Sequence, residues 1–420
     1  MMILGPTGFS TGELTLTFDW LSRLTRPVET HLVISRRIHH LAIDRAAHLH
    51  LLPATSGEPL VGAIRRTFEE VKPDVLVLAD AWLAIVSAPE LGSLYQGRSL
   101  LAPFLLEAQQ RAKVLALDLY DWDRYREQID LFGRPCGPLA TALPAGIGRL
   151  LPSPYLRPTR STEGRGHFAM MERRVPPSGR ERREEKQALG LGDHVVLIAS
   201  SPWQFGFKLI PAATRTAAAL PELAYSLLEL AAERGGPVDV VQLGPVPLPP
   251  PAHLRHLRFH HVPQLEPQRF LSLLRGADLL LSTNTIATSN IRAASLGLPV
   301  ASIYLGRGQP PVPLPRGAAW QALDRYLGAS APSYPLAVGA MGMEQIVRLL
   351  LDQNPFAEIQ RRFDALDPLE AVEGIAALIF ERRAREELRE AQARYFALLE
   401  RELDSPDVAL ERALGGPSGR

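Results

Sequence analysis

The sequence predicts an α/β fold built from two doubly wound domains, followed by helices near the C-terminal end. In both halves, short apolar runs that are typical of buried strands alternate with segments of helical periodicity. A strongly charged stretch with few aliphatic residues, Arg157–Lys186, separates the halves and is expected to be an exposed loop. We therefore expect an N-terminal domain over residues 1–156, an interdomain linker over 157–190, a second domain over 191–340 and a helical segment over 341–420.

The composition narrows the class of protein. The 420 residues suffice for two ordinary domains, and the net charge of +1 comes without a long basic run, so we expect no nucleic-acid partner. No apolar run approaches the ~20 residues that span a bilayer, and the first residues lack the basic start of a signal peptide. Cys136 is the only cysteine, which favours a reducing cytoplasm. Arginine far outnumbers lysine, as in proteins from GC-rich bacterial genomes.

The chain opens with a predicted strand, a glycine-rich turn and a helix. Met1–Leu4 is apolar, and Leu14–Leu24 has apolar residues near helical spacing. Between them, Ser10-Thr11-Gly12-Glu13 fits the S-x-x-E capping box. Glu13 is the only carboxylate in the turn. It either caps the helix or, in a desolvated position, takes a proton from a bound hydroxyl group.

Two further acidic residues follow predicted strands. Asp80 comes after Val75–Ala79, and Asp118 comes after Val114–Leu117. Ligands of open α/β sheets bind at the carboxyl edge of the strands, so these side chains are expected to face a ligand or to make loop hydrogen bonds. The histidines between positions 39 and 50 have no matching carboxylate or cysteine cluster in the sequence, so we predict no metal site.

The second half repeats the alternation of strands and helices. Its predicted strands lie at residues 195–199, 238–243, 257–261, 277–281 and 299–304. The stretch Ala277–Gly306 has the order strand, polar loop, helix, Gly-Leu-Pro and strand. This order predicts a βαβ crossover in a parallel sheet.

The polar loop of this crossover is a candidate anion site. Ser282–Ser289 consists mostly of small polar residues, and a helix is expected over Asn290–Leu296. Thr288 or Ser289 can cap that helix, and its first amides and its dipole favour a phosphate. Arg292 would add a charge-assisted contact to a diphosphate. The alternative is that Ser289 only caps the helix and that Arg292 is a solvated surface residue.

A resemblance to a known family is carried by residues 261–299, which read HVPQLEPQRFLSLLRGADLLLSTNTIATSNIRAASLGLP. This stretch resembles the donor-nucleotide segment of GT-B glycosyltransferases, which include the UDP-glycosyltransferases and the peptidoglycan N-acetylglucosaminyltransferase. Val262-Pro263-Gln264 corresponds to a turn of that family, Ala277-Asp278 to the start of a strand, and Gly297-Leu298-Pro299 to the exit from the helix.

The loop also departs from the family pattern. Arg292 stands where many of these enzymes carry the glutamate that holds the ribose of the nucleotide. Asn284 stands where many carry a histidine, and Ile286 where they carry a glycine. The resemblance therefore concerns the shape and spacing of the loop rather than each of its residues.

The resemblance implies two Rossmann-like domains facing a cleft, the GT-B fold, with the acceptor on the first domain and the donor on the second. Glu13 and Asp118 are the candidates for the catalytic base. The implied donor-binding residues are Ser200, Ser201, Val262, Gln264, Asn284, Thr288, Ser289, Asn290, Arg292 and Gln309.

The implied activity is metal-independent transfer of a sugar from a nucleotide-diphosphate sugar, with UDP or dTDP as the nucleotide, to a small-molecule or glycan acceptor. No other cofactor is expected. Two alternatives remain: a nucleotide-sugar epimerase or hydrolase, and a catalytically degenerate GT-B protein that acts as a partner or activator of another transferase. The long amphipathic stretch Ile375–Leu403 is expected to return to the first domain or to form a homodimer, and Ser405–Arg420 to be a loose tail.

Overall fold

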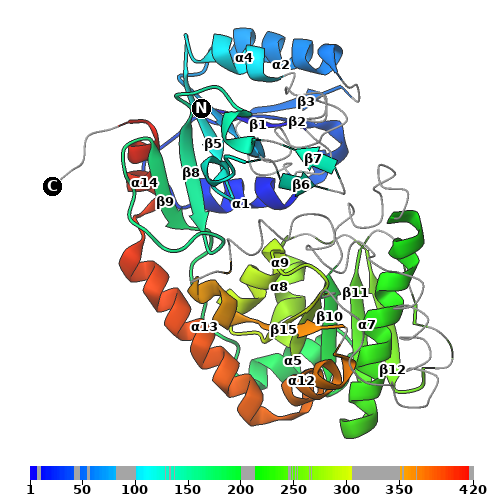
Figure 1. Ribbon diagram of the computed structural model, residues 1–420. Helices are drawn as coiled ribbons and strands as arrows, with labels where there is room; N and C mark the ends of the chain where they lie inside the picture. The colour runs from blue at the N-terminus through cyan, green and yellow to red at the C-terminus, as the bar shows by residue number, and fades with distance from the viewer. Residues whose placement is uncertain are drawn as a thin grey trace. The chain divides into compact units, whose positions relative to one another are not determined.

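The computed structural model of the chain consists of two compact units (Figure 1). Unit 1 comprises Met1–Met171 and Leu398–Arg420, and unit 2 comprises Glu172–Ala397. Each unit contains one large sheet. The structure describes residues 1–6, 11–41, 48–53, 57–81, 101–127, 129–131, 134–136, 138–199, 213–244, 247, 249–250, 252, 254–263, 265, 267–304, 351, 354–365 and 367–415.

Unit 1 is built around a seven-stranded parallel sheet with the order β3-β2-β1-β4-β5-β8-β9. Its strands are β1 (Met2–Gly5), β2 (His31–Ser35), β3 (His48–Leu52), β4 (Val75–Leu78), β5 (Lys113–Leu117), β8 (Gly148–Ser153) and β9 (Arg165–Ala169). The direction of winding reverses between β1 and β4. A separate antiparallel pair consists of β6 (Ile129–Leu131) and β7 (Arg134–Cys136).

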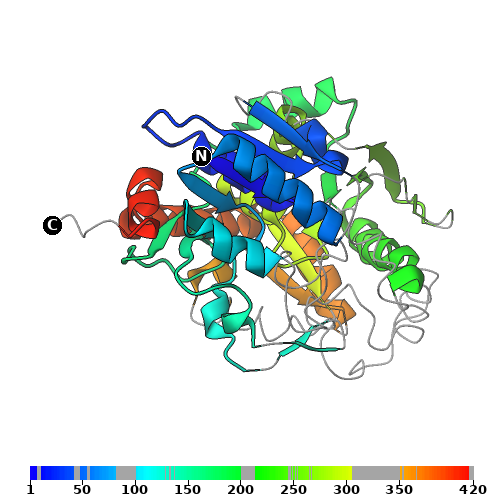
Figure 2. The same ribbon diagram turned by 90° about the horizontal axis from the view of Figure 1, so that it is seen from above.

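The helices of unit 1 cover this sheet. They are α1 (Thr11–Leu21), α2 (Glu58–Val71), α4 (Leu101–Ala108) and α14 (Pro406–Ala413), with 3-10 turns η1 (Arg36–Leu41), η3 (Trp122–Arg124) and η4 (Leu139–Thr141). Figure 2 shows α2 and α4 lying across one face of the sheet. In α2, Leu60, Ile64 and Phe68 recur at helical spacing and are buried, which is why this segment forms an amphipathic helix.

Unit 2 is built around a six-stranded parallel sheet with the order β12-β11-β10-β13-β14-β15. Its strands are β10 (Val195–Ala199), β11 (Val238–Leu243), β12 (Leu257–Val262), β13 (Leu279–Ser282), β14 (Val300–Tyr304) and β15 (Arg361–Asp364). The winding reverses between β10 and β13, as it does between β1 and β4 in unit 1. Two doubly wound α/β units are therefore present, as the sequence predicts.

The helices of unit 2 cover both faces of its sheet. They are α5 (Gly179–Ala188), α7 (Ala213–Gly235), α8 (Pro267–Gly276), α9 (Thr288–Ser295), α12 (Pro368–Phe380) and α13 (Arg382–Glu402, which ends in unit 1), with the 3-10 turn η6 (Pro355–Ile359). Residues of α7 and α12 share one core with Val196 and Leu279. Their strand neighbours Val195 and Leu280 are also fully buried, which explains why these strands are continuously apolar.

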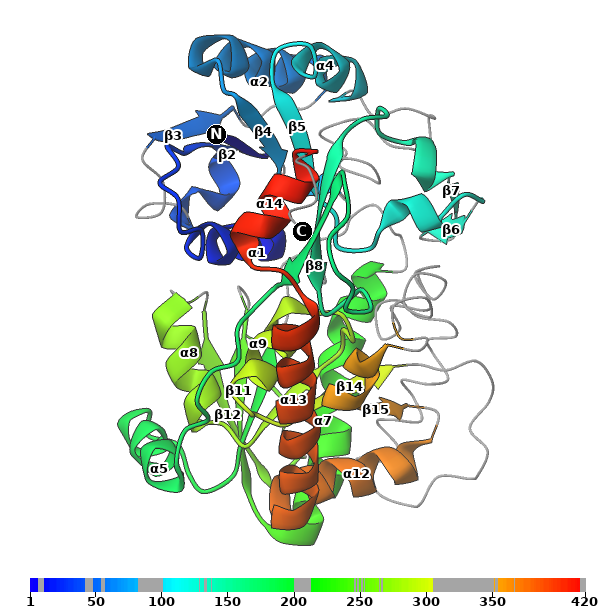
Figure 3. The same cartoon turned by 90° about the vertical axis from the view of Figure 1, so that its left-hand side faces the viewer.

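Sequence analysis did not predict β8 and β9, because their glycines hid the strand pattern. Both strands pack against α14, which lies beside β8 in Figure 3. A Cβ atom on Gly166 would overlap the carbonyl oxygen of Ala409, and one on Gly148 would overlap that of Ala413. The glycines therefore let the backbone of α14 approach the sheet. The expectation of a loose tail over Ser405–Arg420 is wrong for the residues of α14.

The expected linker also contains ordered structure. β9 is the last strand of the first sheet, and α5 begins with a capping box between Ser178 and Glu181. Lys186 of α5 is 8% exposed, and its Nζ atom donates to Asp278 Oδ2 over 2.6 Å. Asp278 Oδ2 also accepts from the backbone N–H of Val195 over 2.8 Å. A buried ion pair thus attaches α5 to the second sheet, and the expectation of an exposed loop over Arg157–Lys186 does not hold.

The C-terminal helical segment is interrupted twice. β15 precedes α12, although this region was expected to be helical. The expected long helix over Ile375–Leu403 is divided at Glu381, whose backbone is extended between α12 and α13. None of the described helices combines the length and apolar character that a bilayer crossing requires.

Candidate functional site

The candidate site of unit 1 lies at the carboxyl ends of β1 and β4, where the winding reverses. Such a reversal leaves room for a ligand beside the strand ends. Glu13 lies in the first turn of α1, the helix that follows β1. Asp80 follows β4, and Asp118 follows its neighbour β5.

Glu13 is the titratable group of this site. Burial raises the pKa of Glu13 to about 8, and the negative charge of Asp80 contributes to the increase. The residue keeps part of its surface exposed, but its carboxyl group is enclosed by protein atoms. A carboxyl group with this pKa can both accept and release a proton near neutral pH, as general acid–base catalysis requires. Ser10, the other half of the predicted capping box, lies outside the described residues.

Two tyrosines lie close to this acidic pair. The rings of Tyr120 and Tyr155 are 6.0 Å apart between centroids, and both side chains are buried. Burial raises the pKa of Tyr120, with contributions from Tyr155, Glu13 and Asp80, so its phenol group stays neutral. The sequence alone does not single out Tyr155, because it lies in a stretch rich in proline and glycine that carries no recognisable motif.

Asp118 has different surroundings. Its Oδ1 atom accepts from the N–H of Tyr120 over 3.1 Å, and its Oδ2 atom accepts from the N–H of Trp122 over 3.2 Å. Arg149 Nη1 also donates to Oδ2 over 3.2 Å. Burial raises the pKa of Asp118 to about 7, although Arg149 opposes the increase. Both carboxyl oxygens hold the loop after β5, which is the hydrogen-bonding alternative considered for this residue.

The same loop contains a D-x-D sequence, Asp121-Trp122-Asp123, a motif that the interpretation of a metal-independent transferase wrongly took to be absent from the sequence. Arg165 donates to Asp121 Oδ1 over 2.6 Å and to Asp123 Oδ2 over 3.1 Å. Arg149 donates to Asp123 Oδ1 over 2.6 Å, and its guanidinium lies 4.5 Å from the Trp122 ring centroid. Each aspartate is thus paired with arginine, and the D-x-D sequence forms part of an ion-pair network.

The candidate site of unit 2 is the loop between β13 and α9, beside the reversal between β10 and β13. Ser282 Oγ donates to the Asn284 carbonyl oxygen over 2.9 Å, and Asn284 Oδ1 accepts from the N–H of Ile286 over 3.1 Å. These bonds make a compact Asx turn. After α9, Gly297 has a left-handed φ of 68°, as expected for a residue just past a helix end.

The start of α9 differs from the prediction. Ala287 occupies the N-cap position without a side-chain cap, so the predicted capping by Thr288 or Ser289 is wrong. The helix begins at Thr288, two residues earlier than expected. Within the part of the chain that the structure describes, the backbone amides of Thr288 and Ser289 donate to no acceptor. Two amides at the positive end of the helix dipole are therefore available to an anion.

Asn290 is held in a buried network instead. Its backbone N–H donates to the Ala287 carbonyl, and its Nδ2 atom donates to the Asn284 carbonyl, both over 2.9 Å. Its Nδ2 atom also lies 3.3 Å from Ser302 Oγ and from Gln360 Oε1. Asn290 is 2% exposed, so its side chain fastens the loop to the sheet.

Arg292 lies in the second turn of α9 and is 8% exposed. The alternative that it is a solvated surface residue is therefore wrong. Helical side chains tilt toward the N-terminus of their helix, which is the direction of the available amides. Val262 ends β12, and its carbonyl accepts from the N–H of Gly244 over 3.3 Å. The other predicted donor residues, Ser200, Ser201, Gln264 and Gln309, lie outside the described residues.

Comparison with solved structures finds proteins that are similar to this chain over nearly its whole length. UGT89C1 from Arabidopsis thaliana, complexed with UDP-L-rhamnose, is similar over 98% of this chain and 97% of that chain, with 12% identity and a TM-score of 0.50. The UDP-GlcNAc 2-epimerase from Neisseria meningitidis bound to UDP-GlcNAc covers the same shares, with 12% identity and a TM-score of 0.46. The glycosyltransferase SnogD from Streptomyces nogalater covers 99% of both chains, with 14% identity and a TM-score of 0.42.

At these identities the similarity to UGT89C1 concerns the fold alone, and the fold of the chain is the GT-B fold that the resemblance implied. The chain belongs to the family described as "Family of unknown function (DUF6365)", which matches residues 23–415. None of the curated proteins matches the chain in sequence.

Proposed function

We propose that this protein is a glycosyltransferase that moves a sugar from a nucleotide-diphosphate sugar to a small-molecule or glycan acceptor. One arrangement carries the proposal. An acid–base group, Glu13, lies beside the winding reversal of one sheet, and anion-binding groups lie beside the reversal of the other. A transferase of this kind needs these two functions, a proton acceptor and a site for a diphosphate leaving group.

In the proposed reaction, Glu13 accepts the proton of the acceptor hydroxyl group. The hydroxyl oxygen forms a bond to the anomeric carbon of the sugar, and the bond from that carbon to the phosphate oxygen breaks with its electron pair. The negative charge then develops on the nucleoside diphosphate. The amides of Thr288 and Ser289, with the positive charge of Arg292, would stabilise this charge.

The residues favour Glu13 over Asp118 as the base. Both oxygens of Asp118 already accept hydrogen bonds, and Arg149 supplies a countercharge. No cation among the described residues lowers the pKa of Glu13. Asp118 is therefore proposed to position Tyr120 and the loop after β5, and Asp80 to keep the pKa of Glu13 high.

The proposal is tested first by nucleotide binding. Thermal unfolding of the full chain is measured with UDP, dTDP, GDP, CDP and ADP. A nucleotide present at 100 times its dissociation constant should stabilise the protein by about 2.7 kcal/mol. We expect a selective response to UDP or dTDP.

Variants locate the binding site. Loss of a charge-assisted hydrogen bond costs about 1.5–3 kcal/mol, so Arg292→Ala should weaken nucleotide binding by about tenfold to a hundredfold. Arg275→Ala is the matched control, because Arg275 is an arginine of α8 that pairs with Glu181 instead. If Arg292→Ala binds the nucleotide as the wild type does, the diphosphate assignment is wrong; Ser289→Ala, which keeps the backbone amide, should bind nearly as the wild type does.

A second candidate is a catalytically degenerate GT-B protein that acts as a partner of another transferase. It is favoured by the internal hydrogen bonds of Asn284 and Asn290, which commit the first side chain to the loop and the second to the loop and to Ser302. A protein of this kind would show no stabilisation by any of the five nucleotides.

A further inference from the structure

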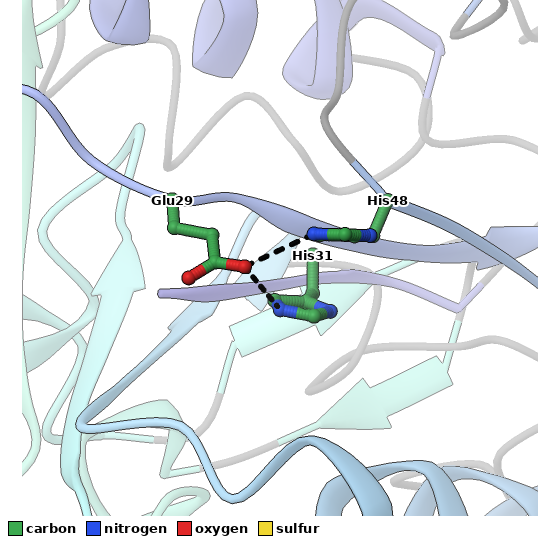
Figure 4. A group of neighbouring side chains, drawn as sticks. All are labelled: Glu29, His31 and His48. Carbon is green, nitrogen blue, oxygen red and sulfur yellow. Dashed lines mark hydrogen bonds and ion pairs between the residues drawn. The ribbon is translucent and has the colours of Figure 1, made fainter.

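A cluster of three histidines and a glutamate lies at the amino ends of β2 and β3, which is the sheet edge opposite to Glu13 and Asp80. His31 is the first residue of β2 and pairs in register with His48, the first residue of β3. His50 lies two residues further along β3, on the same face as His48. Glu29 precedes β2 and lies against both His31 and His48 (Figure 4). The sequence does not reveal this carboxylate as a partner, because parallel pairing alone brings residues 29, 31 and 48 together.

The two distances from Glu29 to the histidines are close to those between neighbouring ligands of one metal ion. Glu29 Oε1 lies 3.0 Å from His48 Nε2 and 3.7 Å from His31 Nε2. In a tetrahedral zinc site with bonds of about 2.0–2.1 Å, neighbouring ligand atoms are about 3.3 Å apart. All three ligand atoms lie within 4.8 Å of one another. The side chains of His48 and Glu29 are 48% and 70% exposed, so they have room to turn toward a common ion.

His50 supplies the partner that orients a metal-binding histidine. His31 Nδ1 lies 3.2 Å from His50 Nε2, so one of these two nitrogens donates a hydrogen bond to the other. If Nδ1 of His31 donates, its Nε2 atom carries the lone pair that faces Glu29. Ligating histidines typically donate their second ring N–H in this way, which fixes the tautomer.

We propose that Glu29, His31 and His48 bind a divalent first-row transition metal ion, with Zn²⁺ as the reference metal and His50 as the residue that positions His31. Two imidazoles and one carboxylate favour such an ion over Mg²⁺ or Ca²⁺, which prefer oxygen ligands. The three ligands leave at least one coordination position open. Bound metal would fasten the edge strand β3 to β2 and to the segment before it. This site is independent of the proposed transferase function.

A second group of carboxylate and histidine side chains lies close together in unit 2, but its hydrogen bonds show a structural role. Glu229 and Glu233 of α7 lie near His256, but Glu229 is 5% exposed, and its oxygens accept from the backbone N–H groups of Arg255 and His256. Its Oε1 atom also lies 2.9 Å from His256 Nδ1. The Glu229 carboxylate anchors the segment before β12, and both of its oxygens already accept hydrogen bonds.

The test is zinc binding by the untagged full chain. Protein is equilibrated with ZnCl₂ and dialysed, and its zinc content is measured. We expect one equivalent of zinc that Glu29→Gln and His48→Ala both lose. His50→Ala should weaken binding by about 10–100-fold, the usual effect of losing an outer-shell partner. Cobalt(II) in place of zinc should give the visible absorption of a low-coordinate site in the wild type only.

Matched controls separate this site from other histidines. His39→Ala removes an exposed histidine of η1, and His256→Ala removes the histidine of the second group. Both variants should keep the full equivalent of zinc. Unfolding midpoints in EDTA should be the same for the wild type and His48→Ala, which shows that the variant is folded. The proposal is overturned if the wild type binds no zinc, or if Glu29→Gln and His48→Ala bind as much as the wild type.

Discussion

The two winding reversals of the protein carry polar residues of different kinds. At the reversal of unit 1, Glu13 and Asp80 are two acidic groups that approach one another, and no cation of the described residues lowers the pKa of Glu13. At the reversal of unit 2, the side chains of Asn284 and Asn290 form hydrogen bonds within the loop and with the sheet. In the first region burial raises the pKa of a carboxyl group, whereas in the second the backbone amides of Thr288 and Ser289 donate to no acceptor among the described residues.

The difference shows how the same topology can present two kinds of polar surroundings. Parallel strands bring polar side chains to one edge in both units, but the charge balance of each edge decides its chemistry. Asp118 illustrates the point within unit 1, because Arg149 and two backbone amides turn a buried carboxylate into a structural anchor.

The largest expected effect concerns Glu13. General acid–base groups contribute about 10²–10⁴-fold to rate, so Glu13→Gln should reduce transfer by that factor. The rate is measured with the donor that nucleotide binding selects. Nucleotide affinity should not change, because the donor groups lie in unit 2. Glu70→Gln, which changes an exposed carboxylate of α2 in the same way, should transfer at the wild-type rate. If Glu13→Gln transfers the sugar at the wild-type rate, Glu13 is not the catalytic base and the contrast between the two regions does not hold.

A smaller effect is expected on stability in the second region. Asn290→Ala leaves Ser302, Gln360 and two carbonyls without a shared partner, which should cost about 1–3 kcal/mol in the free energy of unfolding. Urea unfolding measures this change. Ser289→Ala is the control and should stay within about 0.5 kcal/mol, since its side chain is partly exposed. If Asn290→Ala lowers the free energy of unfolding by less than about 0.5 kcal/mol, the hydrogen bonds of Asn290 do not stabilise the loop.

A change of stability with pH is also expected in the first region. Glu13 has a pKa of about 8 in the folded protein and 4.5 as its ordinary value, so the folded state keeps a proton that the unfolded state releases between these values. Its contribution to stability is complete below pH 4.5 and is lost as the pH rises through 8. The difference in unfolding free energy between the wild type and Glu13→Gln should therefore fall from pH 5 to pH 8.5.

His167 of β9 should change the stability of the protein with pH in the opposite direction to Glu13. Burial, helped by Arg165, lowers the pKa of His167 from 6.5 to about 4, so the folded protein holds this ring neutral. Its contribution to stability is present above pH 6.5 and is lost as the pH falls through 4. Urea unfolding of the wild type and of His167→Gln across pH 4–7 measures the contribution of His167 to the free energy of unfolding. A difference from the wild type that stays constant with pH would contradict the burial of the imidazole.

The sequence by itself determined the α/β class and most strands of both sheets. β10 and β11 begin and end where the sequence predicts, because both strands are largely buried and most of their residues are apolar. The βαβ crossover around α9 was also predicted from the sequence, since Gly297 marks the end of its helix. The carboxylates after the strands were found for the same reason, because the topology of a parallel sheet fixes where strand ends lie.

Only the tertiary structure decided the features that depend on contacts between distant segments. β8 and β9 are strands because they pair in the sheet, and their glycines, Gly148 and Gly166, let α14 pack closely against them. The partners of Asp118 and of Arg165 come from different loops and strands, and the same holds for the cluster of Glu29, His31 and His48. Periodicity describes one segment at a time, whereas pKa shifts and ligand clusters arise from charges that folding brings within a few ångströms of one another.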